Sequence, residues 1–268
     1  MVLSFFASND IDTVDLFLTY FYCSAFSNAR MLAREGVANS LLDILCLIWQ
    51  DEDMNKTRAN ASITCHLCNG IRLLSANDEI CKDMVDHGVL DVLFIILKHS
   101  IGQLSIDKPD VTVSAMSLLR QLLASDHVKN AIQMTEFMDI ISSILQLYLD
   151  DMYSDSSNRV VEHTFGSVSA MCLRNPDASE ALVEHGTAQL IVACMQAMMD
   201  RKELNKDSSI NKSLRQGCMS IRNIASRSPH VRDVLKGYGT IQVIEHAKEV
   251  AKSACTDVGD AAIRDVTA

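Results

Sequence analysis

The chain has 268 residues, of which 48% are hydrophobic and only 5% aromatic, and its formal net charge at pH 7 is −10. This acidic balance argues against a general nucleic-acid binder and against a protein that docks on anionic membranes, since both need a basic surface. Only ten Gly and three Pro occur, and no run of 18 uncharged apolar residues is present, so the composition favours an all-α fold and predicts no membrane-spanning helix.

The first predicted element is a helical segment within residues 1–26. Seven of the fourteen aromatic residues fall between Phe5 and Phe26, and Asp10–Cys23 has the pattern of a long amphipathic helix. Terminal units of a repeat array differ in composition from internal ones because they have a single neighbour. We therefore predict an amino-terminal capping segment, a shortened repeat, over residues 1–26. The stretch Met1–Ala7 contains no basic residue, so a signal peptide is not expected.

Residues 27–268 contain five copies of one pattern. Each copy opens with a Ser or Asn suited to cap a helix, and proline follows at once in two of them, as Pro176 and Pro229. A glycine that can end a helix in the left-handed conformation comes nine to eleven residues later, and in the third copy Glu136 takes that place. The opening residues are Ser27, Asn77, Ser125, Asn175 and Ser228, and the glycines are Gly36, Gly88, Gly186 and Gly239.

Each copy is predicted to form three helices. A short helix precedes the glycine, and a second helix follows it with apolar residues at i, i+3 and i+7, as in Leu90, Leu93 and Leu97. A polar stretch then leads to a longer third helix. These third helices are expected near Lys56–Leu74, Asp110–Ala124, Asn158–Leu173, Asp207–Ser226 and Cys255–Val266. No single triplet can bury so wide an apolar surface alone, so successive copies must stack.

A short helix ending at glycine, a second helix and a long third one resembles the armadillo repeat. Tetratricopeptide and ankyrin repeats are shorter, and HEAT repeats usually lack the short first helix. Three short segments, Leu173–Asp177, Ile221–Arg227 and Ala261–Val266, are similar to the family of armadillo repeat-containing protein six. The resemblance implies an all-α, right-handed α-solenoid of about five armadillo-like repeats, with no assigned chemical activity.

The chain offers little for catalysis or for a cofactor. Cys65 and Cys68 form a single CxxC pair on a predicted helix, and without a second pair they are interpreted as buried packing thiols that hold no metal. His87 and His185 each precede a glycine, where a histidine interacts favourably with a helix carboxyl end. No phosphate-binding loop, nucleophile elbow or zinc-protease motif occurs. A non-enzymatic protein without cofactor is predicted, and its nine scattered cysteines favour the reducing cytoplasm or nucleus.

The third helices are where a ligand is expected, because in armadillo proteins they line a concave groove that holds extended peptides. Importin-alpha-like members read basic peptides with Trp and Asn at fixed positions of these helices. The corresponding Trp positions here hold Asn69, Ser117, Ser167 and Met219, and the Asn positions hold Leu73, Gln121, Met171 and Asn223. With one such Asn and no Trp, recognition of basic signals is not expected.

Arginine recurs just before the Asn position. Arg72, Arg120 and Arg222 occupy it in three of four copies, and Arg215 lies two turns earlier on the last of these helices. Such a row could hold an acidic or phosphorylated peptide through bidentate hydrogen bonds, as the basic groove of beta-catenin-like members holds acidic ligands. Alternatively, each arginine pairs with Asp or Glu of the next repeat and has a structural role. The sequence leaves both interpretations open.

The predicted function is a protein-protein interaction scaffold or adaptor that binds a peptide or protein in its groove. The alternative is a regulator of a folded client, such as a chaperone cofactor or small-GTPase regulator. Nucleic acid, membrane and small-molecule ligands are not expected. The candidate groove residues are Arg72, Arg120, Arg222, Arg215, Asn69, Gln121 and Asn223.

Overall fold

The fold is built from helices alone in the part of the chain that the structure describes. This computed structural model describes residues 31–32, 35–50, 58–75, 77–102, 109–150, 155–205 and 210–268, of which 89% are helical, and no strand occurs within these ranges. The helices divide into two compact units, Met1–Ile132 and Gln133–Ala268. The capping segment predicted over residues 1–26 lies outside the described residues.

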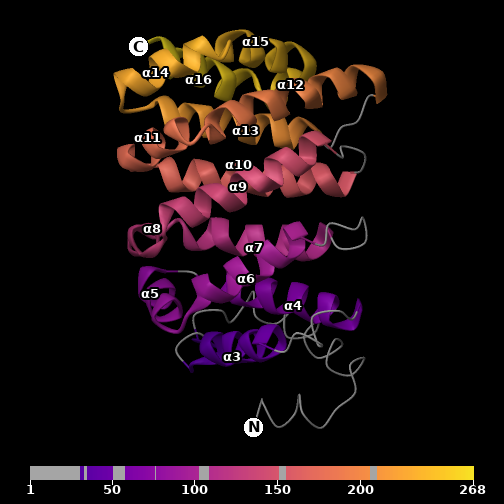
Figure 1. Cartoon of the computed structure of the whole chain (residues 1–268), viewed down its shortest axis with the longest axis vertical. Coiled ribbons are helices and arrows are strands. Elements are labelled where there is room, and N and C mark those ends of the chain that lie inside the picture. The colour runs from indigo at the N-terminus through magenta and orange to yellow at the C-terminus, as the bar shows by residue number, and fades with distance from the viewer. Residues whose placement is uncertain are drawn as a thin grey trace. The chain divides into compact units, whose positions relative to one another are not determined.

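The first unit contains six described helices, coloured indigo to magenta in Figure 1. They are α3 (Val37–Gln50), α4 (Arg58–Leu74), α5 (Asp78–Asp86), α6 (Val89–Gly102), α7 (Pro109–Leu122) and α8 (Asp126–Ala131). The two third helices of this unit, α4 and α7, pack against each other, while α3 packs on α6 and α5 on α8. Their inner faces supply fully buried side chains such as Leu67, Ile71, Leu93 and Leu119.

The second unit repeats this arrangement with the remaining helices (Figure 1). They are α9 (Met134–Asp150), α10 (Asp155–Cys172), α11 (Pro176–Glu184), α12 (Thr187–Asn205), α13 (Ile210–Ala225), α14 (Pro229–Gly237), α15 (Thr240–Ala251), the 3₁₀ turn η2 (Lys252–Ala254) and α16 (Thr256–Thr267). The third helices form one layer, with α13 between α10 and α16, and the second helices form another, with α12 between α9 and α15. Phe165 and Leu214 are fully buried between the layers.

The predicted helix ends are confirmed where the sequence supplies the right residues. Gly36, Gly88, Gly186 and Gly239 have φ between 70° and 82°, and a new helix begins directly after each of them. L-residues with a side chain rarely adopt this left-handed conformation, so glycine is favoured there. At the other end of the first helices, the side-chain oxygen of Asn77 accepts a hydrogen bond from the Ile80 amide at 3.0 Å. Ser228 caps α14 in the same way.

The third copy departs from the predicted pattern. Its first helix, α8, has only six residues, the chain then passes through extended backbone at Ile132, and α9 begins at Met134. Glu136 therefore lies in the first turn of α9, and its assignment to the glycine position was wrong. Without a glycine that accepts positive φ, the chain ends α8 early and joins the helices through extended backbone instead.

The described helices also bear on the membrane question. None of them combines the length and the apolar character that crossing a bilayer requires.

Candidate functional site

The solvent-facing side of α13 carries the strongest positive charge on the third helices of the second unit. Arg215, Met219 and Arg222 follow i, i+4, i+7 spacing and therefore share one face of the helix. Both arginines are exposed, whereas Gly217, Ser220 and Ile224 on the opposite face are buried. Arg215 also donates a hydrogen bond from Nη1 to the carbonyl of Ala254 at 3.0 Å, so it links α13 to η2. This face is basic within a protein of net charge −10.

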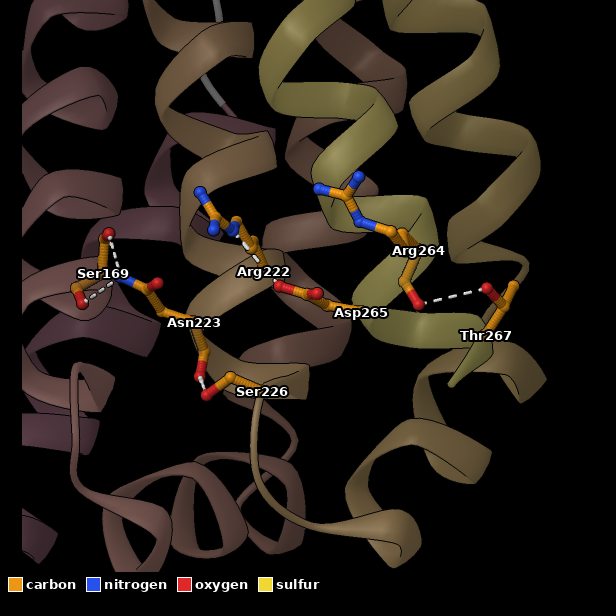
Figure 2. A network of polar contacts seen from close by, with 7 residues as sticks. All are labelled: Ser169, Arg222, Asn223, Ser226, Arg264, Asp265 and Thr267. Atoms are coloured by element: carbon orange, nitrogen blue, oxygen red, sulfur yellow. Dashed lines mark hydrogen bonds and ion pairs between the residues drawn. The ribbon is translucent and has the colours of Figure 1, made fainter.

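Arg222 makes an ion pair with the next third helix. Its Nε lies 3.1 Å from Oδ2 of Asp265 on α16 (Figure 2). The Arg222 side chain nevertheless stays 47% exposed and that of Asp265 30% exposed. An ion pair open to solvent contributes about 0–1 kcal/mol to stability, because water screens it and two long side chains must be ordered. Changing Arg222 should therefore alter surface charge without a large effect on folding.

The amides at the predicted groove positions join neighbouring third helices. Nδ2 of Asn223 donates to both the carbonyl and the hydroxyl of Ser169, each at 2.8 Å (Figure 2). In the first unit, Nε2 of Gln121 donates to the carbonyl of Ser75 at 3.1 Å. The amide of Asn69 reaches Oγ of Ser114 on α7 at 3.4 Å, near the limit for a hydrogen bond. These amide groups already connect neighbouring third helices through hydrogen bonds.

The two other arginines of the predicted row belong to the first unit. Arg72 lies at the end of α4 and Arg120 near the end of α7, and both side chains are half-buried. Nε of Arg72 is buried and has no hydrogen-bond partner within the described residues. Because Arg222 belongs to the second unit, one continuous row of all three arginines stays a prediction.

Sequence reasoning missed two residues of this surface. Arg264 and Asp265 on α16 hold the positions that Arg222 and Asn223 hold on α13, and Arg264 is exposed. The signal was present in the parallel between Ile221-Arg222-Asn223 and Ile263-Arg264-Asp265. Both segments were predicted as third helices, and the structure shows α13 and α16 packed against each other.

A second polar cluster joins α9 to the turn between α11 and α12. Nε2 of His185 lies 3.1 Å from Oδ1 of Asp139, and Nδ1 lies 3.1 Å from Oγ1 of Thr187. Ser142 contacts the same threonine hydroxyl at 2.8 Å. The group combines an acid, a histidine and hydroxyls, but Asp139 is 63% exposed and the cluster lies on the surface. We interpret this cluster as a polar contact between successive repeats. His185 thus has a structural role in addition to the interaction with the carboxyl end of α11 that the sequence predicts.

The CxxC pair on α4 differs from the expectation in one respect. Cys68 is fully buried, but Cys65 is only partly buried, so the prediction that both thiols are inaccessible was wrong for Cys65. Three residues correspond to about 300° around a helix, so Cys65 lies about 60° from Cys68, at the edge of the buried face. Within the described residues, no group of three or more His, Cys, Asp or Glu is placed to hold a metal ion.

The two thiols are expected to react at different rates. Burial raises the pKa of the Cys68 thiol, so its reactive thiolate is scarce at neutral pH, while Cys65 is open to solvent in part. Iodoacetamide at pH 8 should therefore modify Cys65 well before Cys68, as followed by peptide mass spectrometry of the native protein. A Cys65→Ser variant identifies the fast site. Equal rates, or stoichiometric zinc in the purified protein, would contradict this interpretation.

The fold has well-defined counterparts among solved structures. The designed armadillo repeat protein YIII(Dq)4CqI matches 97% of this chain and 95% of its own length with a TM-score of 0.68, at 16% sequence identity. The chain has the armadillo-repeat fold. The designed armadillo repeat protein YIII(Dq.V1)4CPAF, in complex with peptide (KR)4, matches 94% of this chain and 91% of its own, with a TM-score of 0.66 and 16% identity.

Among curated proteins, Armadillo repeat-containing protein 6 from Pongo abelii is 29% identical to this chain over 159 residues. The match covers 58% of this chain and 29% of that protein, so the chain spans under a third of its relative's length. No family model matches the chain. The armadillo resemblance predicted from the glycine spacing and the helix pattern is thus confirmed at the level of the fold.

Proposed function

We propose that this armadillo-repeat chain is a non-enzymatic scaffold that binds an extended acidic or phosphorylated peptide along its third helices. The fold supports a binding role, since a designed protein with the same fold has been solved in complex with the peptide (KR)4. That peptide is basic. Here the exposed third-helix side chains include Arg215, Arg222 and Arg264, so a ligand of opposite charge is favoured.

The observation that carries the proposal is the exposure of Arg222. Its ion pair with Asp265 occupies Nε and leaves 47% of the side chain accessible, so the guanidinium group can still meet a ligand. A buried, fully paired arginine would instead support the purely structural interpretation. Because a guanidinium group offers five N–H donors, one bond to Asp265 does not exhaust it.

The proposal also includes a reducing compartment, either cytoplasm or nucleus. The eight described cysteines are all free thiols, and six of them are buried. Secreted proteins of this size usually oxidise such residues to disulfides.

Peptide binding by charge-reversed variants tests the proposal. Fluorescence anisotropy with a labelled library of acidic octapeptides should show binding to the wild-type protein that weakens as salt is raised, because exposed charges are screened. The double variant Arg215→Glu/Arg222→Glu should bind at least about tenfold more weakly, since each charge-assisted hydrogen bond is worth about 1.5–3 kcal/mol. Its thermal stability should stay close to wild type.

Arg227→Glu provides the matched control. Arg227 is an exposed arginine just beyond the end of α13, so its reversal changes net charge as much as either single reversal does, without altering the face of Arg215 and Arg222. It should retain peptide affinity. Tighter binding of (KR)4 than of the acidic library would overturn the proposal. Failure to bind any peptide, together with capture of a folded protein that ignores the arginine variants, would favour the regulator of a folded client.

A further inference from the structure

Arg222 and Arg264 occupy the same position on two adjacent third helices of the second unit. Each follows an isoleucine and precedes the residue at the Asn position, in Ile221-Arg222-Asn223 and Ile263-Arg264-Asp265. The helices α13 and α16 that carry them pack against each other. In Figure 2 both guanidinium groups extend in the same direction from their helices. The two arginines thus form a neighbouring pair on one exposed surface.

Asp265 restrains one member of this pair. Its carboxylate binds Nε of Arg222 at 3.1 Å, and this bond fixes one side of the guanidinium plane. The terminal Nη groups on the far edge are then presented in a defined orientation. On the neighbouring helix α10 the equivalent position is Ala170, so the arginine pair has no third member there. The pair is a local feature of α13 and α16 and not a uniform stripe.

The chemistry of two adjacent guanidinium edges distinguishes between acidic ligands. A carboxylate has two oxygens and one negative charge, and a single arginine satisfies it through two parallel hydrogen bonds. A phosphoryl group has three acceptor oxygens and a charge near −2 at neutral pH, so it can bind two arginines at once. The Asp265 carboxylate repels a dianion more than a monoanion, so a phosphoryl ligand needs both guanidinium groups.

We infer that Arg222 and Arg264 form a two-arginine site for a phosphoryl group on a side chain of the bound peptide, with Asp265 as the residue that orients Arg222. This inference rests on the proposed function, because the site needs a peptide that lies along the third helices. It adds that one side chain of the peptide carries a phosphoryl group, and that this group binds between α13 and α16.

Three octapeptide pools that differ only in their central residue test the two-arginine site. The central residue is phosphoserine, glutamate or serine, and the flanking positions carry the same mixture of acidic and neutral residues. By fluorescence anisotropy, the wild-type protein should bind the phosphoserine pool at least about tenfold more tightly than the serine pool, and more tightly than the glutamate pool. Arg264→Gln should remove this phosphoserine advantage, measured for each variant as the ratio of its affinities for the phosphoserine and serine pools.

The control variant Arg227→Gln removes one positive charge, as Arg264→Gln does, but at a position outside the arginine pair. It should still bind the phosphoserine pool more tightly than the serine pool. Thermal unfolding of both variants confirms that each is folded. If the pools bind but bind equally, or if Arg264→Gln keeps the advantage, the two-arginine site is wrong and the peptide-binding function stands. If no pool binds the folded wild-type protein, the proposed function fails and the site fails with it.

Discussion

Replacing Gly217 by valine is expected to lower the free energy of unfolding by about 3 kcal/mol. Gly217 lies in the middle of α13, where that helix packs against α10 and α12. A Cβ atom at this position would lie 2.7 Å from Sδ and 2.8 Å from Cγ of Met195, and 3.2 Å from the ring of Phe165. Both neighbours are fully buried, so neither can move without disturbing the core. Urea denaturation followed by circular dichroism measures the loss.

Two further variants separate crowding from other effects of the substitution. Gly237→Val at the end of α14 introduces the same side chain where a Cβ would have nothing within 4 Å, and its stability should stay near wild type. Combined with Met195→Ala, which removes the clashing atoms, Gly217→Val should cost less than the sum of the two single changes. If the losses of stability in Gly217→Val and Met195→Ala add up to the loss in the double variant, the close contact with Met195 is not the cause of the destabilisation.

Gly186→Val and Gly239→Val are each expected to destabilise the protein by about 1–2 kcal/mol, through the backbone alone. Both glycines have positive φ, 81° and 70°, at the turn before a second helix. Space is available at both positions, since a Cβ at Gly186 would have nothing within 4 Å and one at Gly239 would lie 3.8 Å from Gln242. The cost therefore comes from forcing a β-branched residue into the left-handed region.

Gly237→Val again supplies the control, because Gly186 and Gly237 have equally open surroundings and only Gly186 has positive φ. Asparagine tolerates the left-handed conformation better than valine does, so Gly186→Asn should lose less stability than Gly186→Val. Thermal melts that place all four variants at the wild-type midpoint would show that these turns do not depend on glycine.

The fold is predictable from the sequence where particular residues mark the ends of the helices. The caps at Asn77 and Ser228 and the left-handed Gly88 and Gly239 act within three or four residues, so the sequence alone indicates where those helices begin and end. The third copy lacks the glycine, and there the prediction placed Glu136 at a turn although it belongs to a helix. Periodicity alone does not locate a helix end when no residue type marks it.

The candidate site was predictable only in part, because its polar contacts join residues far apart in the chain. Repeat alignment placed Arg222 on an exposed third-helix face, and the structure shows it exposed. The same alignment offered Asn223 as a groove residue, but its amide bonds Ser169, which is 54 residues away. Which of several nearby acceptors a side chain chooses depends on the packing of α10, α13 and α16, and no sequence pattern specifies this.

The bonds between third helices differ in how well they tolerate mutation. Gln121 and Asn223 both donate to a main-chain carbonyl of the preceding repeat, and every residue type supplies that acceptor. Sequence drift at Ser75 or Ser169 therefore keeps the bond to the backbone, so one repeat can evolve independently of its neighbour. The pair of Arg222 and Asp265 uses side chains at both ends, so a change in either repeat breaks it. Of these three contacts, the last alone requires two repeats to change together.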